Sequence, residues 1–290
     1  DNLEPGLKQQ QQPQQQRIEQ EEVKINLQNV PQNRKKLYRI LERIGVGTQG
    51  NCLLAEKDGI QYAMKRYKDG HDDEYQAELT ILQTLQHQYL VSMIEYFTDV
   101  DEGSEGELSR YIILEYCKKG DLGKFLMRNY KRKPMPQEKF IKLATEILQG
   151  IEFMHSMGYG HFDLKPANIF VAEDSSIKLG DFGFSQKFGL TVHGGSQEYI
   201  APEQIQGNNV GTAAIDVFAF GTIALEILTR KKRDLKLEMK QDDWLDVLWA
   251  KECAEYSADL LPVLKSLLHV DPSQRPSASQ ALQTIRQISC

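Results

Sequence analysis

The stretch HFDLKPANIF, residues 161–170, carries three polar side chains that can serve one chemical purpose. Asp163 is followed by Lys165 after two positions and by Asn168 after five. A second aspartate, Asp181, comes soon afterwards in LGDFGF. Carboxylate and amide oxygens are hard ligands of the kind that Mg²⁺ takes from proteins, with phosphates and water filling the other positions. Together these groups are typical of a site that holds a metal and a phosphate.

The same set meets the requirements of phosphoryl transfer. That reaction needs a metal clamp, a positive charge beside the moving phosphoryl group and an acceptor for the hydroxyl proton. The alternative interpretation is a series of unrelated turns, because Asp-x-Gly and Ala-Asn pairs are common in loops. That alternative must explain each position separately, at the right order and spacing, so the chemical interpretation is favoured.

A glycine-rich turn, GVGTQG at 45–50, lies upstream between two strand-like stretches. A GxGxxG pattern alone is a weak signal, and in a Rossmann fold it leads from a strand into a helix. Between two strands it can form a hairpin whose backbone N–H groups lie over nucleotide phosphates. The alternative is an ordinary flexible hairpin.

Lys65, in YAMK, shares a strand face with Ala63 by the two-residue period of a strand. An ammonium that points from an apolar strand into a cleft needs an anion to offset its loss of hydration. Phosphates are one partner, and Glu78 on the following helix is another. Glu74 is a rival, but Glu78 is preferred because Leu82, one helical turn further on, lies on the expected inward stripe.

The composition of the chain changes along its length. Residues 1–36 are rich in glutamine and poor in apolar side chains, so a flexible tail is expected there. Within this tail, residues 17–27 are expected to form either a short helix or an arm packed on the body. A regulatory partner could act through the tail.

Residues 37–115 are predicted to be rich in strands, with an Asp-Gly hairpin turn after CLLAEK. One helix is expected in this part, with Ala77, Ile81 and Leu85 on its apolar stripe. Residues 116–288 read as mostly helical. An α+β protein with two lobes follows from this order.

The composition excludes some classes of function. The chain has 290 residues and a net charge of −6, which gives no bulk attraction to nucleic acid or acidic membranes. The four cysteines are far apart and form no CxxC pair, so an intracellular protein, cytoplasmic or nuclear, is expected. The longest apolar stretch, 213–228, is too short to span a membrane and contains Asp216 and Glu226. A buried core helix is expected there.

The ordered motifs resemble those of the eukaryotic protein kinase domain from about residue 37 to about 288. They are GVGTQG, YAMK, Glu78, LEYCKKGDL, HFDLKPANIF, DFG, APE at 201–203, Asp216 and Arg275. The resemblance implies a bilobal fold, with a small β-rich N-lobe (about 37–115) and a larger helical C-lobe (about 116–288). It also implies an enzyme that uses ATP and Mg²⁺ and phosphorylates a protein substrate.

The resemblance assigns roles by matching position. Asp163 would be the catalytic base, Lys165 would contact the γ-phosphate, and Lys65 would hold the α- and β-phosphates while it pairs with Glu78. The Mg²⁺ ligands would be Asn168 and Asp181. The residues expected to contact ATP are Ile44, Gly45, Val46, Gly47, Thr48, Gln49, Gly50, Cys52, Ala63, Lys65, Leu114, Glu115, Cys117, Asp121 and Phe170.

Two further sets match structural features of the family. The column of side chains that aligns the two lobes, anchored at Asp216, matches Leu82, Met93, His161 and Phe182. Glu203 and Arg275 match a buried ion pair that stabilises the fold.

Phe162 departs from the family pattern, because most members have Arg there. That Arg binds a phosphorylated residue of the activation loop, which here lies between Asp181 and Glu203. It does so by charge-assisted hydrogen bonds, which a phenyl ring cannot form. The motif lacks the Arg that usually precedes the Asp at position 163 and is therefore of the non-RD type. Activity without loop phosphorylation is expected. Phe188 and Leu190 are apolar loop residues against which Phe162 could pack. The alternative is that Lys187 or His193 replaces the Arg.

Serine and threonine are the expected acceptors. Lys165 in DLKPAN and the segment GSQEYIAPE (195–203) resemble Ser/Thr kinases, and Phe184 after DFG favours serine. A pseudokinase-like nucleotide-binding scaffold is the alternative. Pseudokinases typically lack one of the Lys, Asp or DFG positions, and this chain retains all of them. A small-molecule kinase of similar fold is disfavoured, because GSQEYIAPE resembles an element that presents a polypeptide.

Overall fold

The computed structural model describes most of the chain after the glutamine-rich tail. The described residues are 33–46, 50–68, 70–100, 108–131, 133–239 and 241–288. Residues 1–32 of the tail, with the helix or arm predicted at 17–27, lie outside them. Three residues of the glycine-rich turn, Gly47, Thr48 and Gln49, also lie outside them.

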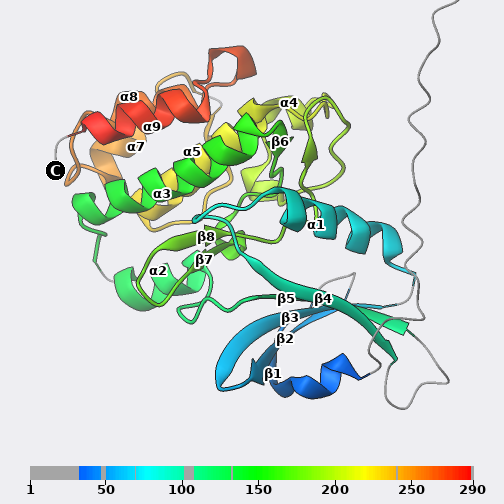
Figure 1. The fold of residues 1–290 in the computed structure, drawn as a ribbon. Helices are drawn as coiled ribbons and strands as arrows, with labels where there is room; N and C mark the ends of the chain where they lie inside the picture. Colours follow the sequence, from blue (N-terminus) through cyan, green and yellow to red (C-terminus); the bar gives the residue numbers. More distant parts are fainter. Residues whose placement is uncertain are drawn as a thin grey trace, which may run out of the picture. The chain divides into compact units, whose positions relative to one another are not determined.

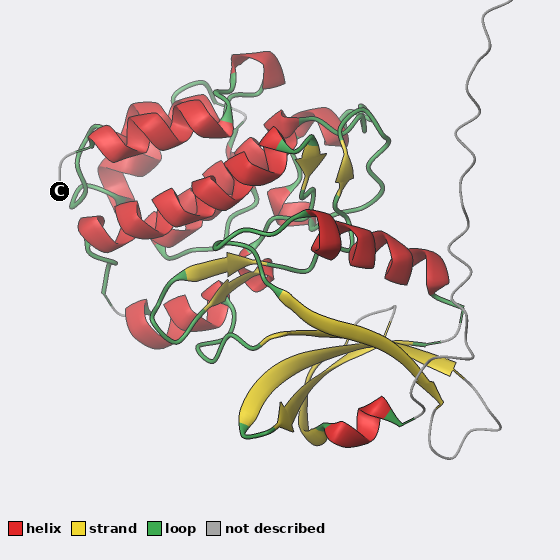
Figure 2. Ribbon diagram, viewed as in Figure 1, coloured by secondary structure: helices red, strands yellow, loops and turns green. Residues whose placement is uncertain are grey.

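One antiparallel sheet forms the N-terminal part of the described chain, with strand order β1-β2-β3-β5-β4 (Figure 2). Its strands are β1 (Arg39–Val46), β2 (Gly50–Lys57), β3 (Ile60–Tyr67), β4 (Met93–Val100) and β5 (Leu108–Glu115). The turn between β2 and β3 is the predicted hairpin, with φ of 53° at Asp58 and 76° at Gly59. Two residues of positive φ are the signature of a tight hairpin turn whose twist matches the strands.

Helix α1 (Asp72–Thr84) lies between this sheet and the helical part of the chain (Figure 1). Its buried residues include Tyr75, Glu78 and Leu82, whereas Ala77 is exposed. The predicted stripe was therefore wrong at Ala77, although Ile81 and Leu85 are buried. The larger Tyr75 takes the inward position because an aromatic ring buries far more apolar area than a methyl group.

The C-terminal part is mainly helical. Its α-helices are α2 (Leu122–Tyr130), α3 (Gln137–Ser156), α4 (Pro202–Ile205), α5 (Ala213–Thr229), α6 (Leu235–Glu238), α7 (Trp244–Glu252), α8 (Leu260–Leu267) and α9 (Ala278–Gln287). Almost every residue of α5 is buried, which confirms the core helix predicted at 213–228. α5 meets α8 closely at Gly221, where an added Cβ would lie 2.9 Å from that of Leu267.

Short elements connect these helices and carry the loops of interest. Two small antiparallel sheets pair β6 (Tyr159–Gly160) with β9 (Gln186–Lys187), and β7 (Ile169–Val171) with β8 (Ile177–Leu179). The 3₁₀ turns are η2 (Arg34–Leu37), η3 (Pro166–Asn168), η4 (Gln197–Tyr199) and η5 (Pro272–Gln274). The α+β fold with a β-sheet N-lobe and a helical C-lobe is therefore confirmed.

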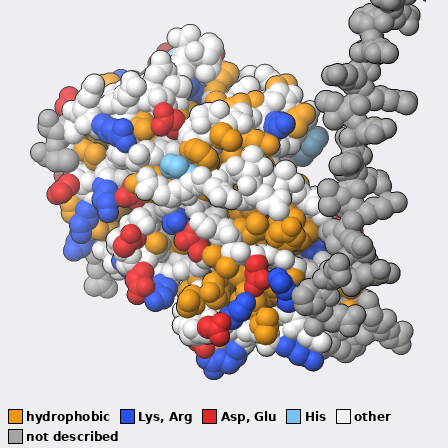
Figure 3. Space-filling model, in the orientation of Figure 1, with side chains coloured by type: hydrophobic (Ala, Val, Ile, Leu, Met, Phe, Trp, Pro, Cys, Tyr) orange, Lys and Arg blue, Asp and Glu red, His pale blue; other side chains and the backbone are white. Residues whose placement is uncertain are grey.

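The surface mixes charges of both signs. On the face drawn in Figure 3, Lys and Arg side chains are interspersed with Asp and Glu. No helix in the described part of the chain combines the length and the hydropathy needed to cross a membrane.

Candidate active site

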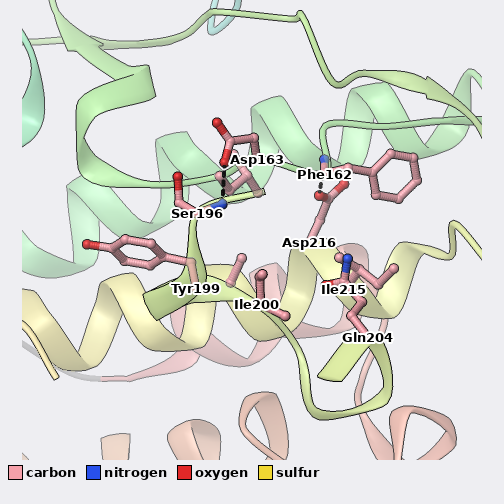
Figure 4. A pocket seen from close by; sticks show the side chains of 10 residues that line it. Phe162, Asp163, Ser196, Tyr199, Ile200, Gln204, Ile215 and Asp216 are labelled. Atoms are coloured by element: carbon pink, nitrogen blue, oxygen red, sulfur yellow. Dashed lines mark hydrogen bonds between the residues drawn. The ribbon is translucent and has the colours of Figure 1, made fainter. Parts of the chain in front are cut away.

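Asp163 lies at the centre of a hydrogen-bond network in the loop after β6. It is 5% exposed, and its Oδ2 accepts from Lys165 Nζ at 2.7 Å and from Asn168 Nδ2 at 3.0 Å. Its Oδ1 accepts from the Ser196 N–H at 2.9 Å, and Lys165 Nζ also donates to Ser196 Oγ at 2.8 Å. Figure 4 shows Asp163 beside Ser196, with the ring of Phe162 directed away from the carboxylate. The network fixes a carboxylate, an ammonium and a hydroxyl in one place.

Asn168 and Asp181 have donor sets suited to a hard cation. Asn168 uses its Nδ2 on Asp163, donating to the carbonyl oxygen at 2.9 Å and to the carboxylate, which leaves the amide oxygen as its metal-binding atom. The Asp181 side chain is 48% exposed, and its Oδ1 accepts from Lys65 Nζ at 3.0 Å. Burial acts to raise the pKa of Asp181, but the Lys65 ammonium outweighs it and the pKa is lowered. An ionised carboxylate and an amide oxygen fit Mg²⁺ that takes its remaining ligands from phosphates and water.

Lys65 lies between two carboxylates. Its Nζ is 2.5 Å from Glu78 Oε2 and 3.0 Å from Asp181 Oδ1. Burial acts to lower the pKa of Lys65, but the two carboxylates raise it well above its ordinary value. Glu74, the rival partner, lies instead 3.3 Å from His71 with its side chain 42% exposed. The structure thus brings Lys65, Glu78 and Asp181 together.

Several residues predicted to contact ATP lie on neighbouring strands of the sheet. Cys52 is opposite Lys65, and Ala63 is opposite Leu114. Burial raises the pKa of the Cys52 thiol to about 11, so the side chain behaves as a small apolar group. Gly45 pairs with Cys52 on the other side. These positions form one continuous surface of the sheet.

The remaining predicted ATP contacts have mixed surroundings. Val46 is 71% exposed at the end of β1, whereas Cys117 is buried. Asp121 forms an isolated bridge with Phe170, and its Oδ1 caps α2 by accepting from the Lys124 N–H at 2.9 Å. Ile44, Gly50 and Glu115 are half-buried. The side chain of Glu115 is paired with Lys178 at 2.9 Å, and its backbone N–H donates to the Ser92 carbonyl at 3.0 Å.

Asp216 fixes the backbone of the loop that carries Asp163, the proposed catalytic loop. Its carboxylate accepts from the N–H groups of His161 and Phe162, each at 2.8 Å, and Nε2 of His155 lies 2.9 Å away. Asp216 is fully buried, and the hydrogen bond from His155 outweighs burial and lowers its pKa. Phe162 has a φ of 61°, a strained region for a bulky residue, which persists only where its surroundings enforce it. Sequence reasoning missed His155, which lies in the last turn of α3 and belongs to no motif.

Phe162 is buried in an apolar pocket beside the activation loop. It is 4% exposed, and its ring contacts that of Phe188, as predicted. Two glycines make room for the ring: an added Cβ would lie 2.2 Å from its Cζ at Gly160 and 2.8 Å at Gly211. Leu190, the other predicted partner, is 53% exposed. The pocket therefore depends on the absence of side chains at two positions.

The activation loop is also fixed by backbone hydrogen bonds to the segment before α5. Gly189 N–H donates to the Gly211 carbonyl at 2.9 Å, and Gly211 N–H donates to the Leu190 carbonyl at 2.8 Å. Val192 N–H donates to the Asn209 carbonyl at 2.8 Å. These bonds hold the loop through its main chain alone.

The inter-lobe column and the buried ion pair occupy their expected places. Leu82, His161 and Phe182 are buried, and the rings of His161 and Phe182 lie 5.6 Å apart. Arg275 donates through both Nη atoms to the two oxygens of Glu203, each at 2.7 Å.

Comparisons with known proteins agree with this geometry. A model of the protein kinase domain family matches residues 38–285. The interferon-induced, double-stranded RNA-activated protein kinase of Mus musculus is 31% identical, over 91% of this chain and 55% of the mouse protein. The probable serine/threonine-protein kinase nek2 of Dictyostelium discoideum is 27% identical, over 84% of this chain and 61% of that protein. The chain spans about half the length of the mouse protein and of its rat counterpart.

Proposed function

The chain belongs to the protein kinase domain family, and we propose that it transfers the γ-phosphoryl group of ATP to serine or threonine hydroxyls of proteins, with serine preferred. The observation that carries the proposal is the network around Asp163. One buried carboxylate is held by Lys165, Asn168 and the Ser196 N–H. This is the arrangement that orients a proton acceptor toward a substrate hydroxyl.

Each polar residue of the site has a separate task in this proposal. Asp163 accepts the proton of the attacking hydroxyl, and Lys165 offsets negative charge on the moving phosphoryl group. Lys65, oriented by Glu78, holds the α- and β-phosphates. Mg²⁺, when bound with ATP, neutralises phosphate charge in the transition state. Asn168 and Asp181 would hold that ion.

We also propose that activity does not depend on phosphorylation of the activation loop. The support is the apolar pocket of Phe162 and the main-chain bonds of residues 189–192, neither of which uses a phosphate. Lys187 and His193 are exposed cations of the loop, and a loop phosphate could pair with them. The pocket, however, already holds the loop without such a pair. Control would then come from a partner, from the tail (1–36) or from the amount of protein.

The acceptor preference rests on sequence and on one contact. Lys165 lies two residues after Asp163 and donates to Ser196, in the segment that presents the substrate in Ser/Thr kinases. The relative from Dictyostelium discoideum is named a probable serine/threonine-protein kinase. We propose that the catalytic domain covers residues 37–288 and that the tail is dispensable for chemistry.

The test is one incubation of the chain with labelled ATP, Mg²⁺ and a degenerate peptide library. Label on serine peptides in preference to threonine peptides, and none on tyrosine, is the expected result. A matched sample with Asp163→Asn should show almost no transfer. Transfer to tyrosine alone, or equal transfer by the variant, would contradict the proposal.

A further inference from the structure

Tyr67 lies two residues after Lys65 on β3 and contacts the same carboxylate. Its hydroxyl donates to Glu78 Oε2, the oxygen that also accepts from Lys65 Nζ at 2.5 Å. Tyr67 and Glu78 are each 1% exposed, so water cannot replace this donor easily. The Lys65 ammonium lies 5.5 Å from the centroid of the Tyr67 ring. Lys65 and Tyr67 thus both donate to the same carboxylate oxygen of Glu78.

The charges of Lys65, Glu78 and Asp181 explain why the Tyr67 hydroxyl stabilises the Glu78 carboxylate. Lys65 shares its single positive charge between Glu78 and Asp181. A buried carboxylate whose counter-ion is shared is stabilised by further hydrogen-bond donors. The Tyr67 hydroxyl supplies one without adding charge. Burial and the nearby Glu78 carboxylate raise the pKa of Tyr67 above its ordinary value, so the hydroxyl keeps its proton at physiological pH.

The ring of Tyr67 also helps to fix the position of α1. It meets the Tyr75 ring edge-on, with 5.4 Å between centroids and 71° between planes. The guanidinium of Arg110, on β5, lies 5.9 Å from the Tyr75 ring and pairs with Asp72 in the first turn of α1. α1 is therefore attached to β3 and β5 at its first turn and at two positions further along. A helix held in this way keeps Glu78 within reach of Lys65.

We propose that Tyr67 is a positioning residue for phosphoryl transfer: its hydroxyl fixes the Glu78 carboxylate, and thereby the Lys65 ammonium, and holds α1 inward without a partner. This inference rests on the proposed function for its effect on turnover, but its effect on α1 can be measured without turnover. The sequence places Tyr67 on the Lys65 face of the strand, yet its contact with Glu78 becomes visible only in three dimensions.

Tyr67→Phe is the direct test, because it keeps the ring and removes only the hydroxyl. Tyr62→Phe is the matched control: Tyr62 lies on the same strand, and its ring instead meets that of Tyr38. In Tyr67→Phe we expect kcat to fall about tenfold, since one hydrogen bond to a charged acceptor is lost. The KM for ATP should change less than about twofold, because Lys65 keeps its charge. The control should retain wild-type kcat.

Hydrogen exchange of the α1 amides, residues 72–84, is the second measurement, and it needs neither ATP nor a substrate. Exchange should be faster in Tyr67→Phe than in the wild type, and unchanged in Tyr62→Phe. Circular dichroism at 25 °C should show both variants fully folded. Unchanged α1 exchange in Tyr67→Phe would overturn the inference whether or not the chain phosphorylates peptides. A fall in kcat that merely matches a fall in the folded fraction would overturn it as well.

Discussion

The ring of Phe162 meets the ring of Phe188 edge-on, with 6.3 Å between centroids and 71° between planes. This contact joins the catalytic loop to the activation loop through apolar surface. Phe188 also meets the ring of His155, which bonds to Asp216 and so to the backbone of the catalytic loop. An edge-to-face pair contributes about 0.5–1.5 kcal/mol beyond the area it buries. This contact supports the proposal that the loop is ordered without a phosphate.

The first prediction concerns loop phosphate. Phosphatase treatment, with complete loss of loop phosphate shown by mass spectrometry, should leave kcat within about twofold of the untreated protein, because the apolar contact remains. Thr191→Ala, at an exposed loop position, should behave in the same way. Ser185 is a poorer candidate for modification, since it is 7% exposed and its hydroxyl donates to the His161 carbonyl at 3.3 Å. A tenfold fall in kcat, about 1.4 kcal/mol, would contradict this prediction.

The second prediction is that Phe162→Arg impairs the protein. The Phe162 ring packs on Phe188 where Gly160 and Gly211 leave room, and the nearby Asp216 carboxylate is already bonded to His155 and to two backbone N–H groups, so a guanidinium there would be buried without a free counter-ion. A loss of about 3 kcal/mol or more in the free energy of unfolding is expected, measured by urea denaturation. Phe162→Leu is the control and should lose less, because leucine keeps the site apolar. Equal stability of the Arg variant and the wild type would show that the pocket opens readily.

Much of the fold could be predicted from local patterns. The Asp-Gly hairpin, the buried helix at α5 and the β-rich and helical halves follow from turn chemistry and hydrophobic period. The prediction that Ala77 lies on the buried stripe of α1 was wrong. An amphipathic pattern gives the approximate apolar side of a helix but does not show which residues at its edge are buried. That helix contacts strands β3 and β5 of the sheet, and the hydrophobic pattern of the helix does not encode the contour of the surface it meets.

The site was predictable where the chemistry is carried by spaced motifs. Lys65 and Glu78 are 13 residues apart along the chain, yet their pairing was predicted from resemblance and face arguments, and the structure confirms the contact. The contacts of His155 with Asp216 and of Tyr67 with Glu78 could not be predicted, because neither residue belongs to a motif. The space that Gly160 and Gly211 leave for the Phe162 ring could not be predicted either, since a glycine in a loop usually indicates a turn.

The third prediction concerns the buried ion pair. Arg275 donates to both oxygens of Glu203 and to three backbone carbonyls, and its guanidinium lies 4.9 Å from the Phe218 ring. Arg275→Ala leaves the Glu203 carboxylate buried and unpaired, which should cost about 3–5 kcal/mol in urea denaturation. Arg286→Ala, at an exposed position of α9, is the control and should change stability by less than about 0.5 kcal/mol. A similar small change for Arg275→Ala would reject the structural role of the pair.

The fourth prediction separates activity from stability at Glu78. Glu78→Gln is nearly isosteric, so the melting temperature should stay close to that of the wild type. Its neutral amide would replace the negative charge that pairs with the Lys65 ammonium and weaken the pairing, so kcat should fall at least tenfold. Glu74→Gln is the control, because that side chain is 42% exposed and lies beside His71. A large loss of stability with kcat intact would assign Glu78 a role in folding alone.

The last prediction concerns Asp163 itself. Asp163→Asn preserves the shape of the side chain but removes the proton acceptor, so kcat should fall by about 10²–10⁴, the usual contribution of a general base. ATP affinity, measured by titration calorimetry with Mg²⁺, should stay similar, because Asp163 is not an expected ATP contact. Asp181→Ala should weaken Mg·ATP binding as well, since it removes a metal ligand. Asp174→Asn, in the exposed turn between β7 and β8, is the control and should keep wild-type kcat. Wild-type turnover by Asp163→Asn would show that another group accepts the proton.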